Sequence, residues 1–237
     1  MWRNCPMRQD ERLGVIERLN IGFDFGALNN RLTGSFDYFV RYTYDMIGPA
    51  PELSSLLGTS VPKINNSDME SYGFELELSW RDRIGDFSYG VKAVVSDAQQ
   101  KVTRYPNKSY SLGTWYNGRM NGDIWGYTTL GIAKSQEEMD AHLAKVNQSR
   151  LGNQWGAGDV MYADLNGDGE ISNGANTLED HGDMKIIGNN TPRYNYGITL
   201  DAAYKGFDFS VFFQGIGKRD YWVSGAYFWG ATGGMWQ

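Results

Sequence analysis

The 237-residue sequence predicts an all-β fold, an antiparallel meander of about six long strands that forms part of a large transmembrane β-barrel. Two observations predict this fold. Apolar and polar residues alternate in six separate runs, as they do in strands that have one apolar and one wet face. The connections between the runs are alternately short and long, which is the pattern of outer-membrane barrels with brief turns on one side and extended loops on the other.

The alternating runs are the predicted strands, and they cover residues 20–25, 35–44, 72–81, 87–96, 194–202 and 207–213. The third run is the clearest, because every second residue from Tyr72 to Trp80 is apolar. Its Phe74, Leu76 and Leu78 are predicted on the outer face of the barrel. Glu75 and Glu77 are predicted on the inner face, because a charge in mid-strand must face water.

The connections separate a barrel from a soluble β-sandwich, which would show the same alternation. The short ones are Leu28–Asn30, Asp82–Asp86 and Lys205–Gly206, rich in residues that tolerate turns. The long ones are expected to be extracellular loops, at residues 46–70 and 104–193. A compact sandwich rarely needs connections of such length, so the pattern favours the barrel.

A short helix is expected within the second long loop. Ser135 followed by Glu138 is an N-terminal capping signature, and Met139, Leu143 and Val146 share one helical face. The segment is predicted to pack on the loop itself.

Composition excludes several classes of protein. The formal net charge of -6 opposes broad affinity for nucleic acid, and we expect none. No stretch is long and apolar enough for a transmembrane helix. Cys5 is the only cysteine, which excludes a disulfide framework. The 30 Gly, 15 Tyr, 11 Phe and 8 Trp residues suit long strands, tight turns and interfacial aromatic girdles.

The first residues, 1–17, are charged and lack an apolar core, so they do not read as a signal peptide. This segment is left unassigned, and residues 18–237 are interpreted as one partial barrel. If the protein is exported, we expect the sequence to be an internal segment of it.

Four stretches resemble the late barrel region of SusC-like (SusC/RagA type) TonB-dependent outer-membrane transporters. One of them reads GDVMYADLNGDGEIS, and another reads DMKIIGNNTPRYNYGITLDAAYKGFDFSVFFQGIGKRDYW. The stretches are residues 29–82, 122–144, 158–172 and 183–222. The resemblance extends over nearly everything after about residue 18.

The resemblance implies a segment of barrel wall and extracellular loops in an importer of oligosaccharides or peptides. The implied location is the outer membrane of a Gram-negative bacterium, in contact with its lipid. The implied partners are a SusD-like surface lipoprotein and TonB, which acts through a plug domain that is missing from these residues. Six strands of the ~22 in such barrels cannot close, so we expect no transport by this polypeptide alone. The alternative is a soluble β-sheet module that binds glycans.

One acidic loop has the beginning of an EF-hand calcium pattern. Side-chain oxygens stand at positions 1, 3 and 5, Gly169 stands at position 6, and a backbone carbonyl is available at position 7. Position 12 is Ala175 rather than the bidentate Glu. The predicted Ca²⁺ ligands are Asp164, Asn166, Asp168, Glu170, Asp180 and Asp183. The alternative is a loop of Asx turns without an ion.

Four loop aromatics are candidates for substrate binding, because aromatic faces can stack on sugar rings. They are Trp115, Tyr116, Trp125 and Tyr127, and packing within the loop is the equally weighted alternative. His142 and His181 are interpreted as surface residues. Glu75 and Glu77 are interpreted as solvated barrel wall rather than an acid–base pair. No enzymatic activity and no organic cofactor are predicted.

Overall fold

The computed structural model describes residues 14–50 and 63–223. The chain separates into two compact units. The sheet unit comprises the described residues up to Asn121 together with Pro192–Lys218, and the loop unit comprises Gly122–Thr191 and the described residues from Arg219 onward. Within the described ranges, no helix is long and apolar enough to cross a membrane.

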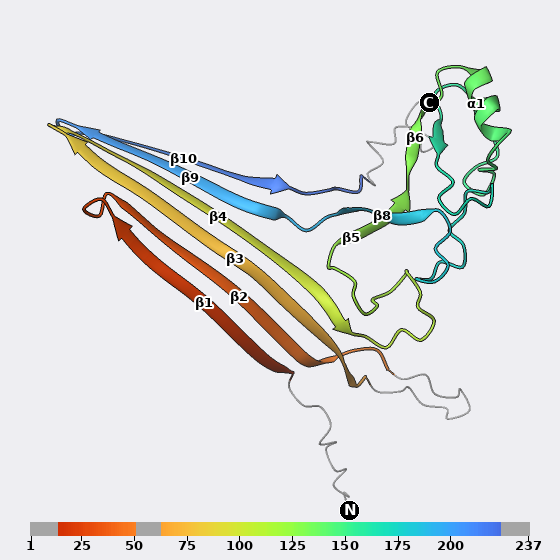
Figure 1. Ribbon diagram of the computed structural model, residues 1–237, viewed down its shortest axis with the longest axis horizontal. Coiled ribbons are helices and arrows are strands. Elements are labelled where there is room, and N and C mark those ends of the chain that lie inside the picture. Colours follow the sequence, from red (N-terminus) through yellow and green to blue (C-terminus); the bar gives the residue numbers. More distant parts are fainter. Residues whose placement is uncertain (1–13, 51–62, 224–237) are drawn as a thin grey trace, which may run out of the picture. The chain divides into compact units, whose positions relative to one another are not determined.

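The sheet unit is one antiparallel sheet of six strands (Figure 1). The strands are β1 (Val15–Ala27), β2 (Leu32–Ile47), β3 (Asn65–Ile84), β4 (Phe87–Arg104), β9 (Arg193–Tyr204) and β10 (Phe207–Lys218). Their spatial order is β1-β2-β3-β4-β9-β10, so each strand pairs with the long strand that precedes or follows it. The predicted six-strand meander is confirmed.

Strands β3 and β4 are much longer than the alternation indicated, at 20 and 18 residues. Beyond Tyr72 and Ser96 both faces become polar, which ends the apolar stripe, but backbone pairing continues to Asp68 and Arg104. Strand pairing needs only hydrogen bonds between backbones, so it can outlast the stripe. The first long connection is therefore residues 48–64 rather than 46–70, and residues 51–62 of it lie outside the described part.

The N-terminal boundary also differs from the prediction. Strand β1 begins at Val15 and pairs there with Tyr44, so it starts within residues 1–17, which the sequence leaves unassigned. Residues 1–13, with Cys5, lie outside the described part.

The short connections adopt left-handed backbone conformations. Leu28, Asn29 and Asn30 all have positive φ, between 55° and 61°. Lys205 and Gly206 have φ of 49° and 89°, as two-residue turns of antiparallel hairpins require. These turns join consecutive strands tightly, as expected.

The register sorts the side chains of the sheet onto two faces. Phe23, Phe36, Leu76, Val95 and Tyr196 form one row across five strands. We call the face that carries this row the apolar face, and the opposite one the polar face. The apolar face has little cover from other described residues, since Phe23 is 60% exposed and half-buried side chains are the norm in the central strands.

The polar face carries the row next to this one, in which Asp37 is the registered partner of Glu75. We call the ends of the strands that lead into the long connections the loop end of the sheet. The few buried apolar side chains of the sheet unit lie near this end, at Val102, Leu112 and Tyr116. The sheet itself has no conventional core among the described residues.

The loop unit contains more structure than the single predicted helix. Helix α1 (Gln136–Leu143) is present, and Ser135 caps it by accepting a hydrogen bond from the Glu138 backbone N–H. Four short strands accompany it, β5 (Asp123–Tyr127) paired with β8 (Met184–Asn189) and β6 (Thr129–Ile132) paired with β7 (Val160–Tyr162). The unit's core contains Ala133, Met139 and Ile171.

Candidate functional site

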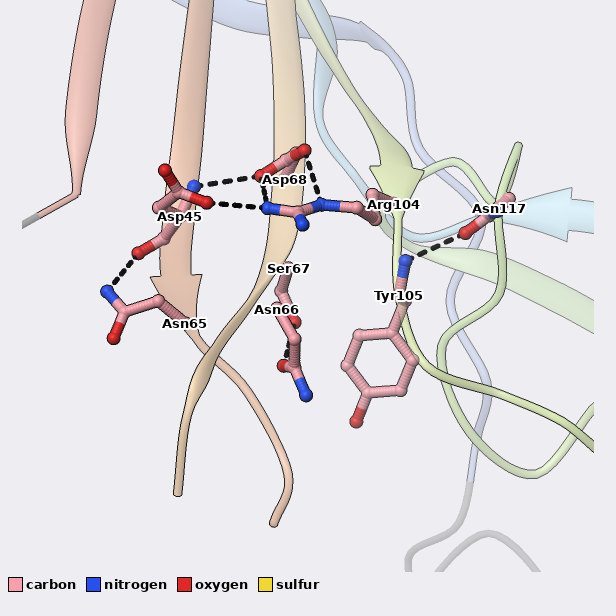
Figure 2. Close-up of polar contacts among 8 residues, drawn as sticks. All are labelled: Asp45, Asn65, Asn66, Ser67, Asp68, Arg104, Tyr105 and Asn117. Carbon is pink, nitrogen blue, oxygen red and sulfur yellow. Dashed lines mark hydrogen bonds and ion pairs between the residues drawn. The ribbon is translucent and has the colours of Figure 1, made fainter. Parts of the chain in front are cut away.

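A network of charges joins the loop ends of β2, β3 and β4 (Figure 2). The Arg104 guanidinium donates to both carboxylate oxygens of Asp68, at 2.7 and 2.8 Å, and to Asp45 Oδ1 at 2.7 Å. The Asp45 backbone N–H also donates to Asp68, at 2.8 Å. The last residue of β4 thus links β2 and β3.

The backbone at Asp45 is what brings its carboxylate to this point. The pairing of β2 with β3 is irregular between Thr43 and Met46, and Asp45 has a φ of 53°. The Asn65 side chain donates to the Asp45 carbonyl and supports this conformation. Hydrogen bonds from Arg104 hold the pKa of the Asp68 carboxyl below its usual value, although burial acts in the opposite sense.

A small recess adjoins the network, with a volume of about 150 Å³. It combines apolar walls with the charged pair, and its lining includes Met46, Met69, Val102, Trp115, Asp68 and Arg104. An aromatic face next to a fixed carboxylate and guanidinium can contact both the apolar and the polar parts of a sugar or a peptide.

Two of the four predicted aromatics lie next to the same arginine side chain, that of Arg119. The Arg119 guanidinium carbon lies 5.2 Å from the Trp115 ring centroid and 5.7 Å from that of Tyr116. Tyr116 is only 6% exposed, so its ring serves the packing of the loop. Trp115 is half-buried and lines the recess, which leaves it as the aromatic that could contact a ligand here.

The other two predicted aromatics belong to β5 in the loop unit. The Trp125 ring lies 5.4 Å from the His181 ring, and Tyr127 meets Tyr162 edge-on at 5.7 Å. The structure therefore places the four aromatics as one pair in each unit. His181 and His142 are half-buried rather than fully at the surface, because Trp125 packs against the first and the second contacts the Gln148 side chain at 3.1 Å.

In the acidic loop, carboxylates accept hydrogen bonds from nearby backbone N–H groups. Asp164 accepts from Gly167 at 2.6 Å and from Gly169 at 2.8 Å. Asp168 accepts from the backbone of Glu170 at 2.8 Å and from the Asn166 amide at 2.9 Å. These bonds hold the pKa of the Asp168 carboxyl below its usual value.

The remaining predicted ligands have partners of their own. Glu170 pairs with Arg150 at 2.8 Å. Asp183 is fully buried and accepts from the backbones of Leu165 and Ser172. Asp180 accepts from the Ala175 backbone at 3.0 Å. The loop has the hydrogen bonds of Asx turns, and calcium binding by it stays a prediction; in the described part of the chain no group of three His, Cys, Asp or Glu side chains is placed to hold a metal ion.

A second ion pair, which the sequence did not indicate, joins β4 to β9. Arg193 Nε and Nη2 donate to the two carboxylate oxygens of Asp97, and Asp97 is 7% exposed. The pair lies where the long loop returns to the sheet, at the first residue of β9. The two residues are 96 positions apart, so only the strand register could have placed them together.

No family model matches the sequence. The curated proteins that it resembles include TonB-dependent receptors. The chain is 27% identical over 212 residues to TonB-dependent receptor P3 of Formosa agariphila, covering 84% of this chain and 20% of that protein. It is 23% identical over 201 residues to TonB-dependent receptor SusC of Bacteroides thetaiotaomicron, covering 81% and 18%.

The fold resembles solved structures with the titles "RagAB peptide transporter" and "RagAB peptide importer in the 'open-open' state". The TM-scores are 0.52 and 0.57 at 21% and 20% identity, over 84% and 85% of this chain and 20% of each of those chains. The chain thus spans about a fifth of the length of the relatives that it matches. The resemblance to SusC-like TonB-dependent transporters and the predicted fold class are both confirmed over most of the chain.

Proposed function

We propose that this chain forms barrel wall and extracellular loops in a SusC-like, TonB-dependent importer of the Gram-negative outer membrane. The observation that carries the proposal is the band of exposed apolar side chains on the apolar face. Its members include Ile21, Phe23, Leu200, Phe207 and Phe209, each more than a third exposed. Keeping these side chains in water costs about 25 cal/mol of free energy per Å² of exposed apolar surface, so contact with lipid is favoured.

The height of the band fits a bilayer. On β4 the apolar stripe runs from Phe87 to Val95, and on β9 it runs from Tyr196 to Tyr204, nine residues in each case by the numbering. A membrane-spanning strand needs about 9–11 residues at a tilt of about 45°. On β4 the next residue of the same face is Asp97, which is neutralised by Arg193. A charged pair there suits the boundary between hydrocarbon and headgroups.

This placement assigns each end of the strands to one side of the outer membrane. The short turns would face the periplasm, and the extended ends of β3 and β4 would project beyond the outer leaflet. The network of Asp45, Asp68 and Arg104 would then lie outside the membrane, with Trp115 beside it. We propose that this end contacts cargo, an oligosaccharide or a peptide, together with a SusD-like lipoprotein.

The comparisons with known proteins support the transport role in this proposal. The named relatives are receptors and transporters, which supports a role in transport rather than an enzymatic one. The cargo, the lipoprotein partner and the coupling to TonB are parts of the proposal.

Dependence on detergent tests the proposal against a soluble glycan-binding module. We expect the purified chain to aggregate in plain buffer and to become monodisperse in detergent above its critical micelle concentration, as measured by light scattering. The reason is that an uncovered apolar face of this size associates in water. A monodisperse monomer in plain buffer that also binds glycans would favour the soluble module.

A further inference from the structure

We infer that Arg18 and Arg41 form a carboxylate-binding site on the lumenal wall of the barrel. The inference rests on the proposed function, because it takes the polar face of the sheet to be the lumenal face. It adds a chemical class to the cargo, namely molecules that carry a carboxylate.

The register places the two arginines directly opposite each other on neighbouring strands. Arg18 on β1 is the registered partner of Arg41 on β2, and both belong to the polar face. Directly opposed residues of antiparallel strands have Cβ atoms about 4.5–5.5 Å apart, and like charges at this spacing repel each other. Both side chains are exposed.

The surroundings on the same face do not compensate this charge. Along the two strands the neighbours are Asn20, Phe39 and Thr43, and the same row continues through uncharged Ser71. The next acidic residue of β2 on this face is Asp37, four residues away or about 13 Å along the strand. Within residues 14–50 and 63–223, neither arginine side chain makes an ion pair or a hydrogen bond.

Four other cations of the sheet unit pair with carboxylates. Lys92 pairs with Glu77 at 2.8 Å, and Arg31 pairs with Asp82 at 3.2 Å. Arg104 and Arg193 each bind both oxygens of one carboxylate through Nε and Nη2. Against this background two opposed arginines with no acid in the adjacent rows of their face stand out, among the described residues, as a site with spare positive charge.

The chemistry of the pair selects an anion of matching shape. A guanidinium presents a planar fork of N–H donors that binds a carboxylate through two parallel hydrogen bonds. A protein wall of low dielectric constant behind the two charges strengthens their field on the side that faces water. A carboxylate would also relieve their mutual repulsion. Among oligosaccharides and peptides, it can come from a uronic acid or from a peptide C-terminus.

The test is uptake by cells that express the gene containing these residues from its own locus. Wild-type cells are compared with cells that carry the double variant Arg18→Gln/Arg41→Gln. Uptake is normalised to the amount of the protein in the outer membrane, which is measured by immunoblot. The cargo arms are a fluorescent peptide pool with free C-termini, the same pool amidated, an oligogalacturonate and a neutral oligosaccharide of equal length.

We expect the double variant to reduce uptake of one carboxylate cargo by about tenfold, the loss of one charge-assisted interaction, and to leave the neutral counterpart unchanged. The arm that responds identifies the source of the carboxylate. Arg18→Lys/Arg41→Lys, which keeps the charge, should restore part of the uptake. The matched control is Lys101→Gln. It also removes one positive charge, but Lys101 lies in the neighbouring row on the apolar face, so this variant should leave the uptake of every cargo unchanged.

Two results would count against the inference in different ways. If the Gln variant loses charged and neutral cargo equally, or loses neither, the arginine pair is no carboxylate site, and the proposed function stands. If wild-type cells take up none of the cargoes and the protein is absent from the outer membrane, the proposed function fails and the inference fails with it.

Discussion

The two units of this chain are held together in opposite ways. The sheet unit has a regular register over six strands, yet its apolar side chains stay largely exposed. The loop unit has short, irregular strands, yet it buries Met139 and Ile171 completely and satisfies buried Asp183 with two backbone donors. The loop unit therefore supplies its own interior, whereas the sheet needs its surroundings to cover one face. Changes that alter the surroundings should affect the first unit far more than the second.

The largest effect is expected from a charge in the middle of the apolar face. Leu78→Lys should destabilise the protein in lipid bilayers by about 2–4 kcal/mol, the cost of a lysine facing the hydrocarbon midplane. The measurement is urea unfolding from liposomes. Its control is Ser35→Lys, on the polar face opposite Glu77, which should change the free energy of unfolding by about 0.5 kcal/mol or less. Equal costs for the two variants would mean that the faces do not differ in environment.

Within the loop unit, we propose that the acidic loop binds Ca²⁺ through Asp164, Asn166 and Asp168. Titration followed by terbium luminescence or calorimetry should give a dissociation constant between about 10⁻⁵ and 10⁻³ M. Asp168→Ala should weaken binding about tenfold or more, through the loss of one charged ligand. Asp140→Ala on α1, which removes an acid whose partner is Gln136, should leave the affinity unchanged. Absence of binding to the wild-type chain at millimolar Ca²⁺ would favour the ion-free Asx-turn loop.

A smaller effect is expected at the loop end of the sheet. The folded-state pKa of Asp68 lies below the unfolded value of about 3.9, so its stabilisation is complete above that pH. It is lost as the pH falls through the folded-state pKa. Hydrogen exchange should therefore show that the protection factors of the β3 and β4 amides near Asp68, taken relative to the intrinsic rate at each pH, fall below about pH 4. Asp68→Asn should show the lower protection already at pH 7, and an unchanged pH profile in this variant would assign the effect to another group.

The smallest effect should be a gain. If Arg18 and Arg41 repel each other in the absence of cargo, Arg41→Gln should stabilise the sheet by about 0.2–1 kcal/mol. Thermal unfolding at low and high salt measures it, because salt screens the repulsion and should shrink the gain. A clear loss of stability at low salt would mean that Arg41 makes a stabilising contact.

The same contrast between the units explains what the sequence could predict. In the sheet, alternation located all six strands and their order, because one face is apolar and the period of two is visible. The ends of β3 and β4 lack this stripe, and Arg104 meets Asp45 and Asp68 across 59 and 36 positions. Side chains so far apart can be paired only when the register is known.

The loop unit shows the limit of periodicity in another way. Its capping signature at Ser135 and Glu138 identified α1, because a cap is a local motif. Strands β5 to β8 have three to six residues each and pair irregularly. Such short strands show no recognisable alternation of apolar and polar residues. Among the candidate site residues, the sequence proposed Trp115 and Tyr116 but could not tell which of the two is buried.

The most direct test of the account is the accessibility of single nitroxide labels along one strand in lipid bilayers. Cys5→Ser is combined with one cysteine at a time from Tyr72 to Trp80, and relaxation by oxygen and by a water-soluble nickel chelate is compared. The account predicts alternation with a period of two, with oxygen favoured at positions 74, 76 and 78 and nickel favoured at positions 75 and 77. Equal access of nickel to both sets of positions would contradict the claim that the apolar face lies against lipid.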